Sequence, residues 1–163
     1  MLARDLAEPY PTVRLSTPAT DAAFLLADGK LPGLLVVDDH DHPVAILPGS
    51  QLLRWIIPTY VQDDAALARV LDEESSDHLC DAIADRTVQD ILSKKKSALP
   101  VVLADDTGIE IAAIMAKEHS PIVAVVEDSS PTATLIGAVS VAHLLERLLP
   151  PKVRQAESAP GQP

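Results

Sequence analysis

Apolar positions along the chain form two sets of elements that follow one another in the same order. Residues 12–15 and 101–103 have the composition of short strands, and each leads into a stretch with helical spacing. The apolar side chains stand at positions 22, 25 and 26 in the first stretch and at 111, 114 and 115 in the second. Each set therefore begins with a strand and a helix of about ten residues.

The rest of each set predicts two strands and a closing helix. A continuous apolar run comes first, which indicates a strand covered on both faces. A polar turn, a second apolar strand and a helix with paired leucines follow. The sequence places the two strands and the turn between them at residues 34–37, 38–43 and 44–47, and again at 122–126, 128–131 and 134–139. The unit is β-α-β-β-α, and the fold class is α/β (α+β).

The two sets are copies of one unit. Sliding the chain against itself by 89 positions aligns residues 21–38 with 110–127, and five of these eighteen positions are identical. With a small gap, the paired leucines of the closing helices also align, as do Asp5 and Asp90. We infer an internal duplication, in which equivalent prolines should have the same surroundings. The identical pairs are Ala23/Ala112, Ala27/Ala116, Pro32/Pro121, Val36/Val125 and Val37/Val126.

Capping signals mark where three helices begin. Thr17 followed by proline predicts a side-chain cap with proline at the first helical position. Thr107 with Glu110 predicts a capping box at the start of the equivalent helix, and Thr87 with Asp90 predicts another.

The segment between the copies is acidic and has helical periodicity. Its apolar positions, Leu67, Val70, Leu71, Leu79 and Ile83, predict one or two connecting helices, with Cys80 on their apolar side and in the core. After residue 149 the chain is rich in Pro, Ser and Gln, which predicts disorder. The expected division is residues 1–57 for the first repeat, 58–86 for the connector, 87–149 for the second repeat and 150–163 for the tail.

Composition indicates which kinds of binding partner are excluded and in which cellular compartment the protein is expected. A net charge of −11 argues against nucleic acid or an anionic membrane surface as the main partner. The single cysteine excludes an intrachain disulfide and fits a reducing compartment. Charges interrupt the N-terminus, and no run approaches the roughly 18 apolar residues of a membrane span. We expect a cytoplasmic protein without direct membrane insertion.

A duplicated β-α-β-β-α unit that closes with Gly137-Ala138-Val139-Ser140, followed by paired leucines, resembles the CBS-domain (cystathionine β-synthase domain) family. The resemblance covers residues 1–57 and 87–149. It implies a disc-like tandem pair, or Bateman module, that is not an enzyme and that commonly forms dimers. Clefts between such repeats bind AMP, ADP, ATP, S-adenosylmethionine or c-di-AMP. The pair then regulates a partner enzyme, transporter or channel.

The family's closing motif, Thr/Ser-x-x-Asp, has a physical basis. The hydroxyl stands where free backbone N–H groups at a helix N-terminus favour phosphate, and the acid accepts the ribose hydroxyls. The second copy keeps the hydroxyl at Ser140 and has His143 in place of the acid. The first copy has Pro48 and Gln51 at these positions, so we expect a nucleotide at the second copy.

The resemblance implies one set of ligand-binding residues. Ser140 and His143 would hold the ribose and phosphate, valines of the preceding strand would form a wall for the adenine, and the segment after the helix would close the pocket. Lys30 and His119 each stand two residues before the equivalent prolines, facing the same cleft. The predicted set is Ser140, His143, Val101, Val102, His119, Pro121, Ile122, Lys30 and Gln51.

Other charged groups have ordinary structural interpretations. Residues 38–42 read Asp-Asp-His-Asp-His, which supplies five metal-ligand types but stands where the repeat requires a solvent-exposed turn. We predict the turn and no metal site. Two interpretations are open for the basic run at residues 94–96, which either lies in a solvated loop or reaches the phosphates of a bound nucleotide. The same holds for Arg54 and Arg147, which either bind such a phosphate or are exposed charges on their helices. No residue stands in a recognisable nucleophile motif, so no catalytic residue is predicted.

Two hypotheses for function remain open. One is a sensor of an adenine nucleotide that acts on a partner protein. The other is a protein-interaction module whose nucleotide sites have decayed, such as a cytosolic accessory of a transporter. Both expect a homodimer, because the closing helices carry partly covered apolar faces, which usually mark an interface. Those faces carry Leu52, Leu53, Trp55, Ile56, Leu144, Leu145 and Leu148.

Overall fold

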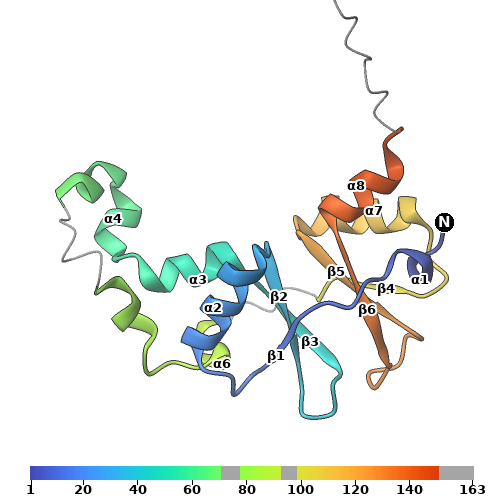
Figure 1. Cartoon of the computed structure of the whole chain (residues 1–163), viewed down its shortest axis with the longest axis horizontal. Coiled ribbons are helices and arrows are strands. Elements are labelled where there is room, and N and C mark those ends of the chain that lie inside the picture. The colour runs from blue at the N-terminus through green and yellow to red at the C-terminus, as the bar shows by residue number, and fades with distance from the viewer. Residues whose placement is uncertain (71–77, 93–98, 151–163) are drawn as a thin grey trace, which may run out of the picture.

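The structure is a computed structural model that describes residues 1–70, 78–92 and 99–150. The first half contains β1 (Thr12–Arg14), α2 (Ala19–Gly29), β2 (Gly33–Val37), β3 (Pro43–Pro48) and α3 (Gly49–Ile56). The second half contains β4 (Val101–Leu103), α7 (Gly108–Glu118), β5 (Ile122–Val126), β6 (Leu135–Ser140) and α8 (Val141–Leu148). The predicted α/β architecture and its two β-α-β-β-α units are confirmed (Figure 1).

Each half forms its own three-stranded sheet with the same pairing. β1 runs parallel to β2 and β2 antiparallel to β3, and β4, β5 and β6 repeat this arrangement. A register shift falls between Val36 and Val37 and again between Val125 and Val126. Every residue of β2 and β5 is buried, as their continuous apolar runs predicted. The duplication therefore extends to local irregularities of the sheets.

The equivalent prolines have the expected equivalent surroundings. Lys30 and His119 end α2 and α7 with φ of 49° and 51°, in the left-handed region. The Pro32 carbonyl then accepts the Gly49 N–H at 3.1 Å, and the Pro121 carbonyl accepts the Val141 N–H at 3.0 Å. Each proline thus ties the end of one helix to the start of the closing helix.

Short helices at the start of each unit are exchanged between the halves. α1 (Ala3–Leu6) packs in the core of the second half with Val102 and Ile111, and α6 (Val88–Ile91) packs in the core of the first half. Backbone bonds of 3.0 Å in both directions join Glu8 to Ala138. Figure 1 shows α1 beside β4 and α7, far from the helices of the first half. The halves are therefore linked by crossed segments as well as by the connector.

Two of the three predicted caps are confirmed. The Glu110 carboxylate accepts the Thr107 N–H at 2.7 Å and its hydroxyl at 2.8 Å, and these bonds lower the pKa of Glu110. Asp90 accepts the Thr87 N–H at 2.9 Å in the same way. The prediction for Thr17 is wrong. Its Oγ1 accepts the Arg14 N–H at 3.0 Å, which closes a turn, and Pro18 rather than Thr17 stands at the cap of α2.

The connector is helical, but much of it is not α-helix. It contains α4 (Thr59–Asp63) and two 3₁₀ helices, η1 (Ala65–Val70) and η2 (Leu79–Ile83). The prediction that Cys80 is buried is wrong, because it assumed an α-helical period. The five residues of η2 are too few to bury a whole face, and Ile83 alone of them lies in the core. Leu71, the lysine run at 94–96 and most of the predicted tail lie outside the described residues.

The described helices are all shorter or less apolar than a bilayer crossing requires.

Candidate functional site

The two closing motifs occupy equivalent places at the ends of the sheets. Ser140 pairs with Ile122 at the end of β6, and Pro48 pairs with Gly33 at the end of β3. Each residue directly precedes a closing helix. The Ser140 hydroxyl accepts the His143 N–H at 3.2 Å, whereas the start of α3 has no side-chain cap. The structure therefore places the predicted hydroxyl at a helix N-terminus, in the second half only.

Two carboxylates lie near the same ring nitrogen of His143. Its Nδ1 is 3.5 Å from an oxygen of Glu8, which belongs to the exchanged N-terminal segment, and 3.9 Å from an oxygen of Glu146. The His143 side chain is 20% exposed, so one part of the ring still faces solvent. Two nearby negative charges disfavour a phosphate at this ring but leave it able to bond a neutral hydroxyl.

The equivalent position in the first half is also engaged within the chain. Gln51 donates its Nε2–H to the Ile91 carbonyl at 2.8 Å, and Trp55 donates its indole N–H to the same carbonyl at 3.2 Å. The guanidinium carbon of Arg86 lies 5.2 Å from the centroid of the Trp55 ring, which is a cation–π contact. α3 and the exchanged α6 are thus held together by side chains on one face of α3.

A groove of about 1060 Å³ follows this contact. Ten residues line it, and its polar members come from α3, from α6 and from Arg86 just before α6. The sequence pointed to Gln51 and Arg54 as candidate ligand contacts, whereas Trp55, Arg86 and Asp90 are brought to the groove only by the fold. The spacing of Gln51, Arg54 and Trp55 places them on one helical face and was the available signal. Arg86 comes from the far side of the connector, which no local pattern connects with α3.

Other predicted residues separate into cleft and core positions. Val101 lines a cleft of about 410 Å³ between the halves, together with Leu103 of the same strand, Leu99 just before it and Pro43 from the first half. Val102 and Ile122 are 1% and 0% exposed and have their side chains in the protein interior. Their side chains therefore cannot form the wall of an open pocket.

The remaining predicted residues divide between the two halves. His119 and Lys30 are exposed at equivalent left-handed helix ends, and Pro121 is half-buried. His119 and Pro121 belong to the Ser140 end of the second sheet, whereas Lys30 belongs to the Gln51 end of the first. These predicted residues therefore lie at equivalent ends of two different sheets and do not line one common pocket.

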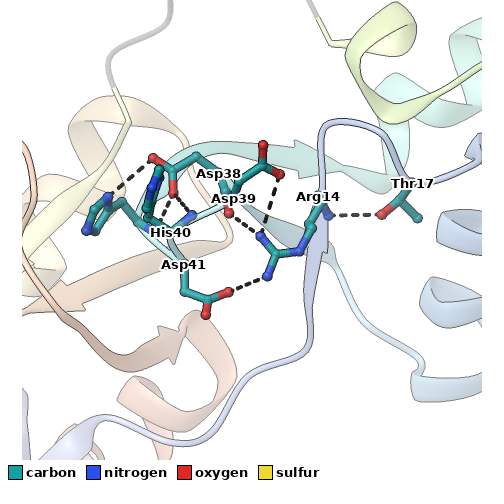
Figure 2. Close-up of polar contacts among 7 residues, drawn as sticks. Arg14, Thr17, Asp38, Asp39, His40 and Asp41 are labelled. Atoms are coloured by element: carbon teal, nitrogen blue, oxygen red, sulfur yellow. Dashed lines mark hydrogen bonds and ion pairs between the residues drawn. The ribbon is translucent and has the colours of Figure 1, made fainter.

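The hairpin turn that follows β2 is fixed by its own side chains (Figure 2). Asp38 accepts the N–H groups of His40 at 2.8 Å and His42 at 2.9 Å, and these bonds, that of His42 foremost, lower the pKa of Asp38. Arg14 of β1 donates to the Asp38 carbonyl and, at 2.9 Å, to a carboxylate oxygen of Asp41. In the described ranges no three His, Cys, Asp or Glu side chains are placed to hold a metal ion. The hydrogen bonds of Asp38 and Arg14 are those that a hairpin turn needs, and they explain the composition of residues 38–42.

Comparison with known proteins gives one consistent family. The CBS domain model matches residues 3–58. A CBS domain-containing protein of unknown function from Kribbella flavida is 44% identical, with a TM-score of 0.75, over 90% of this chain and 97% of that one. No curated protein sequence matches.

Two more distant structures share the fold and contain ligands. CBSX2, solved in complex with AMP, is 19% identical with a TM-score of 0.63, over 90% of this chain and 94% of that one. The CBS domain pair of protein MJ0100, solved with 5′-methylthioadenosine and S-adenosyl-L-methionine, is 19% identical with a TM-score of 0.62, over the same shares of the two chains.

Proposed function

Because this chain belongs to the CBS-domain family, we propose that it is a non-catalytic regulatory pair that binds an adenosine-containing ligand between its repeats and transmits that state to a partner protein. The observation that carries the proposal is the Ser140 hydroxyl at the N-terminus of α8, where the family places its ligand-binding hydroxyl. The AMP and S-adenosylmethionine complexes of structural relatives support this ligand class. Such a protein would act in the cytoplasm, on an enzyme, transporter or channel.

The proposed domain division follows the repeats in sequence. Residues 1–57 and 87–149 form the two repeats, residues 58–86 connect them, and residues 150–163 form a tail. The exchanged α1 and α6 support a single regulatory unit, because each repeat completes the core of the other. A ligand that contacts both repeats can then change their relative arrangement.

His143 is proposed to recognise the ribose and not the phosphate. Because Nδ1 lies 3.5 Å from a Glu8 oxygen, a neutral His143 would carry its proton on Nδ1, and its other ring nitrogen would accept from a ribose hydroxyl. Glu8 and Glu146 make the surroundings negative, which disfavours a phosphate at the ring. His119, Pro121 and the exposed face of Val101 would complete the binding surface, and Lys30 and Gln51 would take the equivalent roles in the first repeat.

Removing the Ser140 hydroxyl should weaken ligand binding. We expect Ser140→Ala to raise the Kd for the adenosine ligand about fivefold, which corresponds to about 1 kcal/mol for a neutral hydrogen bond. Isothermal titration measures this directly. Ser140→Thr is the matched control, since it keeps the hydroxyl that caps α8, and Pro48→Ala should leave the Kd unchanged. A larger effect of Pro48→Ala than of Ser140→Ala would show that the site is in the first repeat.

The regulatory state is proposed to involve a homodimer. Leu53 is 56% exposed on α3, and Leu145 and Leu148 are 47% and 39% exposed on α8. Of the other residues expected at this face, Leu52 and Leu144 are buried in their own cores, and Trp55 contacts Arg86. Exposed leucines on equivalent helices favour a second copy as partner. Light scattering should give a molar mass of twice the 17.3 kDa of one chain. A molar mass equal to that of one chain would contradict the proposed dimer.

A ligand-independent interaction module is the second candidate function. The supporting observation is that both positions of the family's acid carry other residues, Gln51 and His143, and that both side chains already make contacts within the chain. Losing a charge-assisted bond to ribose weakens binding by about 1.5–3 kcal/mol. A partner that co-purifies in stoichiometric amount and whose binding ignores adenosine ligands would favour this function over the sensor.

A further inference from the structure

Large apolar side chains are exposed on the helices that cover the two sheets. Figure 1 shows α2 and α3 beside the first sheet and α7 and α8 beside the second. Phe24 of α2 is 68% exposed, and Ile109 of α7 is 69% exposed. Leu53 and Leu145 are exposed on the helices that pack against α2 and α7. Each repeat therefore presents an apolar helical face that a second chain can cover.

The duplication relates these two faces position by position. The shift of 89 positions relates α2 to α7. Gly49 and Val141 begin the closing helices and donate to equivalent prolines. Leu53 of α3 therefore corresponds to Leu145 of α8. Because the backbones correspond, a second copy can dock with each repeat on the same repeat of its partner, as a parallel dimer, or on the other repeat, as an antiparallel dimer.

The charges at equivalent positions of the two faces are reversed. Asp28 of α2 corresponds to Lys117 of α7, and Arg54 of α3 has an equivalent of opposite charge on α8. That equivalent is Glu146, and all four residues are exposed. A residue at the centre of a contact meets its own copy in a parallel dimer and its equivalent from the other repeat in an antiparallel one. The parallel dimer therefore brings like charges together, whereas the antiparallel dimer pairs each charge with an opposite one.

Contacts within the chain leave these charges accessible to a partner. Lys117 lies 3.8 Å from Glu118, and its side chain is 82% exposed. Glu146 lies 3.9 Å from a ring nitrogen of His143, and its side chain is 80% exposed. Exposed charges of this kind add little to affinity, but they decide between two similar arrangements because like charges in one place repel.

Side-chain size favours the same arrangement as charge. Phe24 corresponds to Ala113. Ile109 corresponds in the same way to Thr20. In an antiparallel dimer each large side chain meets a smaller one from the other repeat, and the contact fills without a clash. In a parallel dimer two Phe24 rings meet at one place and two Ala113 methyl groups leave a gap at another.

We propose that the helical faces bind a second copy of this chain in an antiparallel arrangement, with the first repeat of each copy on the second repeat of the other. The inference rests on the dimer of the proposed function and adds its orientation. Both contacts form at once, so the assembly closes as a dimer and leaves no helical face for further copies. The second repeat, which carries Ser140, is then covered on its helical side by the partner's first repeat.

Exchange of the charges tests the pairing of Arg54 with the partner's Glu146. Arg54→Glu and Glu146→Arg should each raise the dissociation constant of the dimer about tenfold, because the dimer contains the contact twice. The double variant should return the constant to within about threefold of the native value. Arg69→Glu makes the same charge change on the connector and should leave the constant unchanged. Sedimentation equilibrium measures each constant, and a double variant no tighter than the single ones would contradict the pairing.

Cysteine crosslinking reads the orientation directly. Leu53→Cys and Leu145→Cys are each made in a Cys80→Ser chain, because the native Cys80 thiol is exposed. The two variants are mixed, allowed to exchange subunits and treated with a short bis-maleimide, and mass spectrometry identifies the linked peptides. Crosslinks between the two variants are expected, with few within either variant alone.

The other outcomes separate the orientation from the dimer itself. If each variant links only to itself, the antiparallel arrangement is overturned and the dimer stands. If neither links although light scattering gives the mass of two chains, the interface lies on another surface and the inference is also overturned. The mass of one chain by light scattering would overturn both the orientation and the dimer, whereas ligand titration tests the sensor separately.

Discussion

Gly137→Val should destabilise the protein by about 1–3 kcal/mol or more, because it forces the N-terminal segment off the second sheet. A Cβ atom at Gly137 would lie 2.5 Å from the carbonyl oxygen of Glu8 and 3.1 Å from its carbonyl carbon. Those are backbone atoms of the same residue that bonds Ala138 in both directions at 3.0 Å. They cannot shift without breaking those bonds and withdrawing α1 from the core.

Chemical denaturation measures the effect of this substitution. Gly49→Ala is the matched control, because a Cβ there would meet its nearest neighbour, the Pro32 carbonyl oxygen, at an ordinary contact distance of 3.7 Å. Gly49 begins α3, where alanine is tolerated, so the control should change stability by less than about 1 kcal/mol. Equal stability of Gly137→Val and the native chain would mean that residue 8 does not lie against β6.

Leu6→Ala should cost about 2–5 kcal/mol and destabilise the second half, although Leu6 belongs to the first repeat in the sequence. Its side chain is 0% exposed and packs in the core of the second half with Met115 and Val139. Truncation removes apolar contacts and leaves a cavity that the surrounding sheet fills only in part. The loss should appear in the unfolding of the second half.

Two matched substitutions test the exchange of segments. Ile91→Ala should cost a similar amount at the equivalent place in the first half, where Ile91 is 1% exposed. Val70→Ala, at a position that is 80% exposed, should have an effect within about 0.5 kcal/mol. Amide hydrogen exchange shows in which half each substitution lowers the stability. If Leu6→Ala increased exchange in β2 and not in β5, α1 would belong to the first half.

The repeated elements were predictable because their signals are local. The apolar runs of β2 and β5 and the capping box of Thr107 and Glu110 each depend on neighbouring residues. The alignment of Pro32 with Pro121 then shows that the same local signals occur twice. The exchange of α1 and α6 was not predictable in this way. Leu6 and Ile91 align in sequence, but the duplication offers each helix two similar sheets, and the alignment does not choose between them.

For the candidate sites, too, local positions could be predicted from the sequence, but contacts between distant segments could not. Ser140 and Pro48 were placed correctly in the closing motifs, since strand pairing follows from the repeat. Val102 was placed in the pocket wall although it faces the core, because the strand was predicted without the side on which its helices pack. The Arg86–Trp55 contact joins the end of the connector to the helix before it, and the apolar spacing of the connector predicted α-helix where the structure has 3₁₀ turns.

Titration of the full chain with AMP, ADP, ATP, S-adenosylmethionine and c-di-AMP tests the central claim most directly. Isothermal calorimetry should detect saturable binding of at least one of them, weakened by Ser140→Ala and retained in Ser140→Thr. Absence of binding by all five at millimolar concentration would contradict the sensor, and the chain would then be a CBS pair that acts through protein contacts alone.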